Sequence, residues 1–339
     1  MPVDLRTLAA VVPAAVVARF RGVRAALVVG HEDPDADALG GALAIGLVVE
    51  ALGGRATVAA AEPVPAVYGF LPGVEAVVTD PDPAVAYELL VMCDCGDLSR
   101  VGAIRERNRE LFERLPVLSI DHHASNDGAV GLAWIDPAAA ATCEMVALLA
   151  TRLGVPLGAA DGRLAAALMA GIVMDTATFA HPNTTPRTLL VAAALLEAGA
   201  PLSDTSRRLY RTKPAAQLRL FGRVLGRLEE HAGGLVVAAT LELADLAGTG
   251  ALAEYSEGII DLLSQAEAAE VALLLKEQGA ETRVSIRTRP GGVDATRLAG
   301  KWGGGGHARA AGATVQLPLS DARAAVLAEA VRLARAVTR

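Results

Sequence analysis

Two patterns of apolar and polar positions alternate along the first half of the chain. Short runs rich in β-branched residues predict strands, and the longer alanine- and leucine-rich stretches between them predict helices. The predicted strands cover residues 26–29, 56–59, 76–78, 89–93 and 117–120. The predicted helices cover residues 40–52, 99–115, 143–153 and 161–172. Strands that alternate with helices are typical of a parallel sheet covered on both faces, so we predict an α/β domain here.

The alternation of predicted strands and helices ends at a short polar stretch between Pro182 and Pro186. Pro186 suits the first turn of a helix. The pattern beyond it predicts helices over residues 186–198, 203–210 and 214–230, strands over 235–241, 271–275 and 283–288, and a last helix from Asp321. A chain of 339 residues is long for one core. We therefore predict a first domain over residues 1–185, a helical linker over 186–212 and a smaller α/β domain over 213–339.

Titratable side chains gather where several apolar runs of the first half end. The four clusters are HEDPDAD at residues 31–37, Asp94, Asp121-His122-His123, and Asp175. The carboxyl ends of parallel strands meet at one edge of a sheet, and ligands gather there. We therefore expect the four clusters to lie together. Their mixture of carboxylate and imidazole groups suits a pair of divalent metal ions.

Two other readings of the first cluster fail on spacing. Asp33, Asp35 and Asp37 match the first three positions of a calcium-binding loop. Such a loop needs glycine at its sixth position and glutamate at its twelfth, but here these positions hold Ala38 and Ala44. The pattern Gly-x4-Gly-Lys-Ser/Thr of a phosphate-binding loop does not occur in the sequence.

Charge is unevenly distributed along the chain. The net charge of −7 divides into −10 for residues 1–185 and +3 for residues 186–339. This division indicates cations bound in the acidic half and anionic substrate groups bound in the other, although simple drift of surface charge would give the same division. Aromatic residues make up 3% of the chain, which argues against a base-stacking surface for long single strands.

The three cysteines, Cys93, Cys95 and Cys143, have no disulfide-framework spacing, and residues 1–20 lack the pattern of a signal peptide. No apolar run is as long as the roughly 18 residues that a membrane-spanning helix needs. We therefore expect a reduced, cytoplasmic protein without a membrane partner. Cys93 and Cys95 flank Asp94, so on a strand they would point away from it and serve in packing.

These motifs resemble those of the DHH phosphoesterase superfamily along nearly the whole chain. The matching residues are His31-x-x-Pro34-Asp35-x-Asp37, Asp94, Asp121-His122-His123 and Asp175. IDHHASND (residues 120–127) and Gly303-Gly304-Gly305-Gly306-His307 resemble the branch of bifunctional oligoribonucleases and adenosine 3′,5′-bisphosphate phosphatases. The resemblance implies a parallel-sheet DHH domain, a helical linker and a substrate-binding DHH-associated domain, with the active site in the cleft between the domains. The fourth motif commonly reads Asp-Thr-Gly in the family, whereas this chain has Ala177 in place of the glycine.

The resemblance also implies a metal centre. It implies two Mn²⁺ ions per chain, with Mg²⁺ or Co²⁺ as substitutes, held by His31 and Asp35 at the first ion, by Asp37, His122 and Asp175 at the second, and by Asp94 bridging both. Catalytic roles fall to Asp94, to His123 beside the phosphate, and to Asp121 as the residue that orients the two histidines. Ligand histidines are usually fixed through their other ring nitrogen, which gives Asp121 a physical reason to be there.

Substrate binding is implied for residues near the far end of the chain and for one arginine of the first half. These residues are Gly304, Gly305, Gly306, His307, Arg287 and Arg100. Glycine lets backbone amides approach phosphate oxygens, especially at a helix start, and an arginine can grip a phosphate through two hydrogen bonds. The alternatives are a flexible linker for the glycine run and an ordinary helix-start residue for Arg100.

We therefore predict a manganese-dependent hydrolase. It would cleave short oligoribonucleotides and linear or cyclic dinucleotides to mononucleotides, and adenosine 3′,5′-bisphosphate to AMP, by a hydroxide activated by two metal ions. Its partners would be short single-stranded RNA or DNA oligonucleotides and nucleotide phosphates, and a homodimer is compatible with this reading. The alternatives are an inorganic pyrophosphatase or polyphosphatase, and a nucleotide sensor without activity. The sensor would require a lost ligand, and all motif ligands are present.

Overall fold

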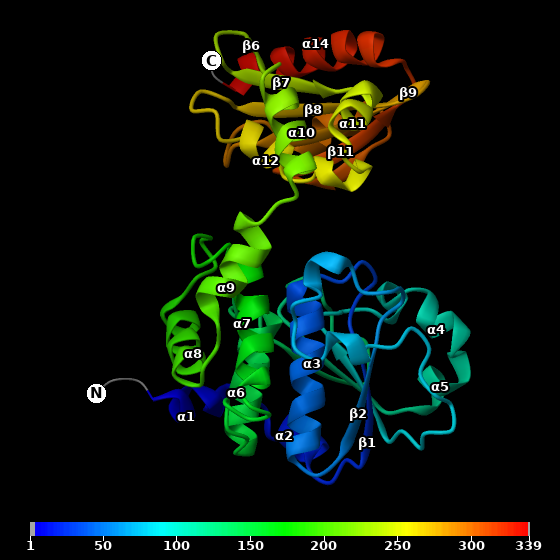
Figure 1. Ribbon diagram of the computed structural model, residues 1–339, viewed down its shortest axis with the longest axis vertical. Coiled ribbons are helices and arrows are strands. Elements are labelled where there is room, and N and C mark those ends of the chain that lie inside the picture. Colours follow the sequence, from blue (N-terminus) through cyan, green and yellow to red (C-terminus); the bar gives the residue numbers. More distant parts are fainter. Residues whose placement is uncertain (1–3, 338–339) are drawn as a thin grey trace. The chain divides into compact units, whose positions relative to one another are not determined.

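Five parallel strands form the central sheet of the first unit of the computed structural model, which describes residues 4–337 (Figure 1). The strands lie in the order β2-β1-β3-β4-β5 and comprise β1 (Ala25–Val29), β2 (Arg55–Ala59), β3 (Leu89–Cys93), β4 (Val117–Asp121) and β5 (Leu132–Ile135). β3 is buried along its whole length and β1 along all but its first residue. Their uninterrupted apolar runs therefore suit the middle of a sheet that is covered on both faces.

Helices cover both faces of this sheet. They are α1 (Leu5–Leu8), α2 (Ala14–Phe20), α3 (Ala36–Ala51), α4 (Ala103–Arg107), α5 (Arg109–Arg114), α6 (Thr142–Leu153), α7 (Arg163–Asp175), α8 (Pro186–Glu197), α9 (Leu202–Ser206) and the π-helical turn η5 (Arg207–Arg211). The apolar sides of α3, α6, α7 and α8 form one core with the sheet. A second core lies on the opposite face, under α4 and α5 (Figure 1).

A mixed sheet of six strands forms the second unit. Its order is β10-β11-β9-β8-β7-β6, with β6 (Glu229–His231), β7 (Val236–Leu241), β8 (Val271–Gln278), β9 (Glu281–Thr288), β10 (Gly305–His307) and β11 (Ala310–Val315). The β7–β8 pair is parallel and the other neighbours are antiparallel. α13 (Ala295–Gly300) and α14 (Leu319–Val337) pack on one face, and α10 (Ala215–Leu225) and α12 (Ile259–Leu263) pack on the other, with α11 (Leu243–Thr249) beside them.

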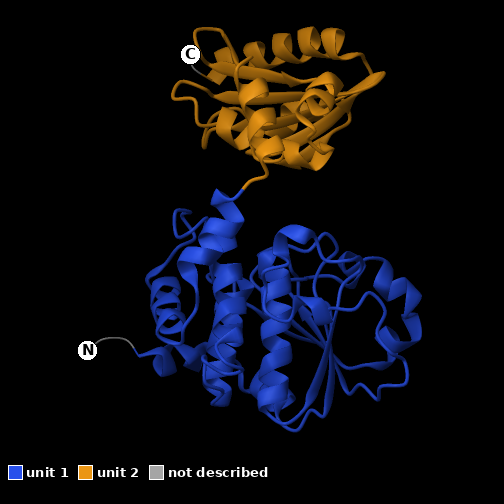
Figure 2. Ribbon diagram, viewed as in Figure 1, with its two compact units in different colours: residues 1–212 blue, residues 213–339 orange. Residues whose placement is uncertain are grey.

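The two units are Met1–Thr212 and Lys213–Arg339 (Figure 2). The parallel sheet of the first unit and the separate mixed sheet of the second confirm the predicted α/β class. Residues 186–212 are helical and lie within the first unit, where Val191 and Leu195 of α8 are buried in the core. Within residues 4–337, we find no helix that combines the length and the apolar character needed to cross a bilayer.

Several predicted elements are wrong. Residues 76–78 form no strand: the 3₁₀ turn η3 (Val74–Ala76) precedes an isolated bridge between Val78 and Ala59. The helix predicted over 99–115 is broken into η4 (Leu98–Val101), α4 and α5, because Gly102 has a left-handed φ of 75° and Asn108 leaves the helical conformation. The helix predicted over 214–230 ends at Leu225, and β6 follows it.

Candidate metal centre

The four titratable clusters of the sequence converge at the carboxyl edge of the first sheet. Their potential ligand atoms form three overlapping groups, each with its atoms within 4.8 Å of one another: His31–Asp35–Asp94, Asp37–His122–Asp175 and Asp94–His122–His123. Three of the clusters follow strands β1, β3 and β4. Asp175 is instead the last residue of helix α7, which extends three residues beyond the end predicted at residue 172. The structure thus brings together all six predicted metal ligands and His123.

Asp94 lies at the centre of this arrangement. Its side chain is 3% exposed, and its two carboxylate oxygens face different histidines: Oδ2 lies 3.6 Å from His31 Nε2, and Oδ1 lies 3.6 Å from His122 Nε2. Burial alone would raise the pKa of Asp94, but the nearby histidines and a hydrogen bond from Thr142 outweigh it and lower the pKa. One carboxylate therefore contacts both halves of the cluster.

The histidines are held through their Nδ1 atoms. Nδ1 of His31 donates to the carbonyl oxygen of Glu32 at 2.6 Å, and Nδ1 of His122 donates to that of Ala139 at 3.3 Å. These bonds leave Nε2 of both rings to act as a metal ligand. Burial would lower the pKa of His122, but its hydrogen bond to Asp175 and the surrounding carboxylates raise it to about 10.

Asp37 is fully buried at the start of α3, against the first turn of α6. Its Oδ2 accepts a hydrogen bond from the backbone N–H of Thr142 at 2.6 Å, and its Oδ1 accepts one from that of Cys143 at 2.9 Å. α7 passes so close that a Cβ on Gly171 would lie 2.3 Å from Oδ1. Burial, together with the charges of Asp175 and Asp94, raises the pKa of Asp37 well above its usual range.

Asp35 caps the helix that carries Asp37. Its Oδ1 accepts hydrogen bonds from the backbone N–H groups of Asp37 at 2.8 Å and Ala38 at 3.0 Å. Capping and metal binding are compatible because a carboxylate has two oxygens with about four acceptor positions. The closely spaced aspartates of HEDPDAD thus include a helix cap, Asp35, and two candidate metal ligands, Asp35 and Asp37.

His123 is oriented by Asp121, whose side chain is fully buried. Oδ1 of Asp121 accepts from His123 Nδ1 at 2.8 Å, and Oδ2 accepts from Asn126 Nδ2 at 2.8 Å. The hydrogen bond to Asp121 raises the pKa of His123. Asp121 was expected to orient both histidines, but it contacts His123, whereas His122 is held by the Ala139 carbonyl.

The donor set fits divalent metal ions. Carboxylate oxygens and imidazole nitrogens are the ligands that Mn²⁺ and similar ions take in proteins. The pKa of Asp37 is raised by burial and by neighbouring carboxylates, and that of Asp175 is raised chiefly by burial. Two neighbouring carboxylates with a raised pKa indicate that this half of the site lacks positive charge. A pair of divalent cations would supply it.

Three contributors were not predicted from the sequence. Thr142 contacts two of the aspartates, Asn126 fixes Asp121, and Arg187 pairs with Asp136 and the buried Glu144 behind the cluster. Asn126 belongs to the IDHHASND stretch, so a signal for it was present. Thr142 and Arg187 carry no local motif, because their contacts join segments more than forty residues apart.

The candidate substrate residues of the second unit share one face of its sheet. His307 on β10 pairs with Ala310 on β11, and Ala310 pairs with Arg287 on β9, so the three side chains form a row. Arg287 Nε donates to Asp261 Oδ1 at 3.0 Å. In the first unit, Arg100 is exposed on η4, and its carbonyl accepts from the Glu32 N–H at 2.7 Å.

The glycine run enters a strand and does not begin a helix, which corrects the expected setting. It follows α13 and leads into β10, which pairs with β11. A Cβ on Gly304 would lie 2.2 Å from the Gly312 carbonyl oxygen, and one on Gly306 would lie 2.5 Å from that of Ala310. The reading of this run as a flexible linker is therefore wrong, because the run is paired in a sheet and close backbone packing requires glycine at positions 304 and 306.

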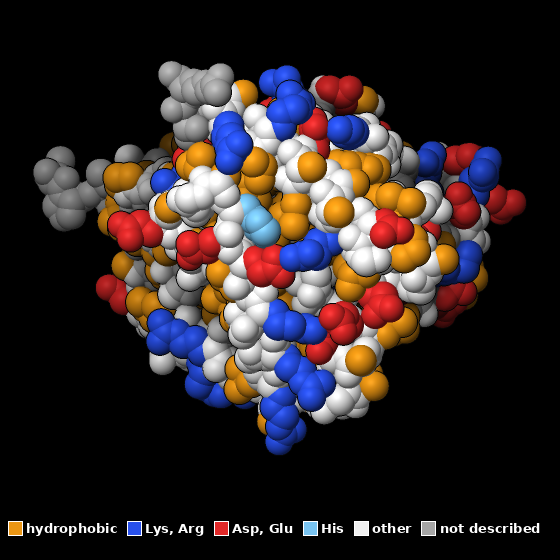
Figure 3. Space-filling model, turned by 90° about the horizontal axis from the view of Figure 1, so that it is seen from above, with side chains coloured by type: hydrophobic (Ala, Val, Ile, Leu, Met, Phe, Trp, Pro, Cys, Tyr) orange, Lys and Arg blue, Asp and Glu red, His pale blue; other side chains and the backbone are white. Residues whose placement is uncertain are grey.

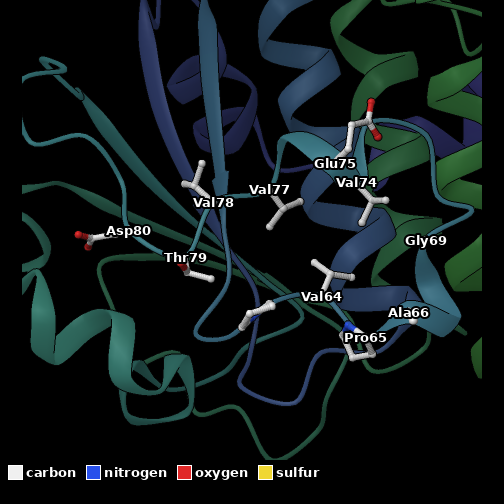
Figure 4. Close-up of a pocket in the computed structure, with 11 residues that line it drawn as sticks. Val64, Pro65, Ala66, Gly69, Val74, Glu75, Val77, Val78, Thr79 and Asp80 are labelled. Carbon is white, nitrogen blue, oxygen red and sulfur yellow. The ribbon is translucent and has the colours of Figure 1, made fainter.

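A separate groove of about 600 Å³ lies on the first unit, along the segment that follows β2 (Figure 4). Its lining is mostly apolar and includes Val64, Val74 and Val77, with Glu75 and Asp80 as its acidic side chains. Among the described residues, none that lines this groove belongs to the carboxylate–histidine cluster. The candidate metal centre is therefore a different site.

Comparison with known proteins agrees with this geometry. Residues 25–172 match the model of the DHH family, N-terminal domain, and residues 233–337 match that of the DHHA1 domain. The chain is 39% identical over 303 residues to the bifunctional oligoribonuclease and PAP phosphatase NrnA of Thermus thermophilus. The aligned region covers 89% of this chain and 87% of that protein. The protein of the same name from Bacillus subtilis is 26% identical over 227 residues, or 67% of this chain and 70% of that protein.

The fold also matches a solved structure. A crystal structure of an exopolyphosphatase-related protein from Bacteroides fragilis superposes with a TM-score of 0.84 at 20% identity, covering 96% of this chain and 98% of that one. This likeness concerns the fold. The two domain models, the extent of the relationship to the Thermus protein and the converging motifs lead to one conclusion: the chain belongs to the DHH family of phosphoesterases.

Proposed function

We propose that this protein is a metal-dependent phosphoesterase that hydrolyses short oligoribonucleotides and linear or cyclic dinucleotides to mononucleotides, and adenosine 3′,5′-bisphosphate to AMP. The observation that carries the proposal is the convergence of three histidines and four aspartates into overlapping groups. Within each group the potential ligand atoms lie within 4.8 Å of one another. The names of the relatives from Thermus and Bacillus support the choice of substrates.

The proposal assigns ligands to two ions. His31 and Asp35 would hold the first, Asp37, His122 and Asp175 the second, and Asp94 would bridge both. The two Asp94 oxygens, which face different histidines, support the bridging role. Mn²⁺ is the proposed ion, with Mg²⁺ or Co²⁺ as substitutes, because the donors are mixed oxygen and imidazole and include no thiolate.

A pair of divalent cations bound here would neutralise charge on the phosphate and lower the pKa of a water molecule to near 7. The chain's own residues would position the reacting groups. His123 has its Nδ1 engaged by Asp121 at 2.8 Å, so Nε2 is available to donate to a phosphate or leaving-group oxygen. Asn126 holds the second oxygen of Asp121 and thereby fixes the imidazole ring.

The second unit would hold the nucleotide. Arg287 and His307 lie on one sheet face with only the small Ala310 between them. We assign phosphate contacts to Arg287, to His307 and to the backbone of Gly304, Gly305 and Gly306, as well as to Arg100 of the first unit.

Long single strands are less suitable substrates. The face of the molecule shown in Figure 3 carries basic and acidic side chains side by side, so this face offers no continuous basic track for a long nucleic acid. The low aromatic content of 3% also argues against a stacking platform for many bases.

The compartment and the assembly state belong to the same proposal. Cys93, Cys95 and Cys143 are free and buried, which supports a reducing cytoplasm as the working compartment. A homodimer is compatible with the proposal, and sedimentation of the purified full chain measures the assembly state directly.

A substrate panel at fixed Mn²⁺ tests the proposal. The panel contains adenosine 3′,5′-bisphosphate, linear and cyclic dinucleotides, 5′-phosphorylated RNA from two to about ten nucleotides, and pyrophosphate. We expect turnover of the bisphosphate and the short RNAs, loss of turnover with chelator, and loss in Asp94→Ala. Pyrophosphate as the preferred substrate would favour the pyrophosphatase alternative, and no turnover of any substrate with Mn²⁺, Mg²⁺ or Co²⁺ would refute the proposal.

A further inference from the structure

We infer that Thr142 is a positioning residue that fixes the plane of the Asp94 carboxylate, so that one oxygen faces each half of the metal centre. The inference rests on the proposed function, because it concerns how the bridging carboxylate is held. Thr142 is fully buried at the first residue of α6. Its Oγ1 donates to Asp94 Oδ1 at 2.9 Å, and its backbone N–H donates to Asp37 Oδ2 at 2.6 Å. One residue thus contacts the bridging aspartate and an aspartate of the second group.

The hydroxyl contact selects one orientation of the Asp94 carboxylate. The terminal torsion of an aspartate is broad, and a turn of 180° only exchanges its two equivalent oxygens, so the hydroxyl contact fixes the tilt of the carboxylate plane. With Oδ1 bonded to Thr142, this oxygen lies near His122, and Oδ2 is left near His31. Each oxygen keeps an acceptor position for an ion. Without the hydroxyl, the carboxylate could rotate and engage a single ion through both oxygens.

The start of α6 holds Asp37 in the same way. The N–H groups of Thr142 and Cys143 donate to separate oxygens of Asp37, at 2.6 and 2.9 Å. α6 has 12 residues, and the N–H groups at the start of a helix favour a carboxylate there. These contacts come from the backbone, so they persist when only the Thr142 side chain is changed.

A purely structural role for the Thr142 hydroxyl is poorly supported by its contacts. The N-cap of α6 is Ala141, which has no side chain to cap the helix, and the Thr142 hydroxyl donates across to Asp94 instead. Thr151, on the same helix, shows the ordinary alternative, because its Oγ1 donates to the Ala147 carbonyl within α6 at 2.9 Å. Thr151 therefore provides a matched control.

The test is Mn²⁺ binding to the full chain, measured by calorimetry for affinity and by electron paramagnetic resonance for the spin-coupled ion pair. Thr142→Val keeps the shape and the backbone N–H but removes the hydroxyl. We expect it to weaken binding of one of the two ions by about 10- to 100-fold and to lose the coupled signal. Thr142→Ser should restore both, and Thr151→Val should behave like the wild type.

The outcomes separate the two claims. A wild type that binds no pair of ions would overturn the proposed function together with this inference. A Thr142→Val protein that binds a coupled pair with wild-type affinity would overturn the inference alone. Should Thr142→Val lack the wild-type far-UV circular dichroism, Thr142→Ala is measured in its place. Equal binding by folded Thr142→Ala and Thr142→Ser would contradict the role of the hydroxyl.

Discussion

Replacement of Arg187 by methionine should strongly destabilise the first unit. Arg187 lies at the start of α8, where its Nε donates to Glu144 Oε1 at 2.5 Å and its Nη1 donates to Asp136 Oδ2 at 2.8 Å. The Glu144 side chain is fully buried and the Arg187 side chain is 17% exposed. Methionine retains the aliphatic bulk but leaves the Glu144 carboxylate buried without its cation.

The magnitude follows from this burial. Removal of one partner of a buried ion pair costs about 3–5 kcal/mol, because the remaining charge stays out of water. For a unit of this size, a loss of 1 kcal/mol lowers the melting temperature by roughly 2–4 °C. We therefore expect the melting temperature of the first unit to fall by roughly 6–20 °C in Arg187→Met.

Tryptophan fluorescence makes the assay specific for the first unit. The chain has two tryptophans, with Trp134 on β5 of the first unit and Trp302 in the second. In a Trp302→Phe background, urea and thermal unfolding followed by fluorescence report on the surroundings of Trp134, which is 5% exposed. Arg207→Met is the control, because Arg207 forms an exposed ion pair with Asp204 and its loss should leave the midpoint unchanged.

A double variant tests the cause of the loss. Replacement of both Arg187 and Glu144 by methionine removes the unpaired charge, so much of the lost stability should return. The reasoning is refuted if Arg187→Met unfolds within 1 kcal/mol of the parent, or if the double variant is no more stable than the single one.

Three further predictions concern the metal centre. Gly171→Ala should cost about 1–3 kcal/mol and abolish Mn²⁺ binding, because the added Cβ would lie 2.3 Å from Asp37 Oδ1. Gly222→Ala, inside α10 with open space around it, should instead raise the free energy of unfolding by about 0.5–1 kcal/mol and leave the calorimetric titration unchanged. Ala177→Gly should raise the free energy of unfolding by about 0.5–1 kcal/mol in urea, because Ala177 has a left-handed φ of 46°; a loss of stability would contradict this. A pKa of about 10 keeps His122 protonated at neutral pH in the metal-free protein, so metal binding should release protons, and titration in two buffers of different ionisation enthalpy measures this release. The protonated His122 stabilises the metal-free fold fully below about pH 6.5, and this contribution is lost as the pH rises through about 10. Because Mn²⁺ binds the deprotonated imidazole, Mn²⁺ affinity should increase with pH over that range.

The strands that were predicted correctly have strong local signals. β3 and β4 are runs of apolar and β-branched residues that fit a buried parallel sheet, so pattern alone locates them. β10 is Gly305-Gly306-His307, and glycine has little strand propensity, so this strand depends on its pairing with β11 and could not be read from the local sequence.

The residues of the site likewise divide into those with a local sequence signal and those placed by contacts between distant segments. Its ligand candidates carry motifs, whereas the contact between Thr142 and Asp37 joins residues 105 positions apart and has no local signature. Asp175 is identified by its motif, and the helix predicted over residues 161–172 reaches it because α7 continues three residues beyond the predicted end.

The chain passes between its two units once, from Thr212 to Lys213. Each unit is therefore an uninterrupted length of polypeptide, so a single breakpoint in the coding sequence separates the two. Recombination at that breakpoint would exchange the second unit and leave the carboxylate–histidine cluster of the first unit intact. A fold organised in this way allows the second unit to diversify during evolution while the cluster of the first is inherited unchanged.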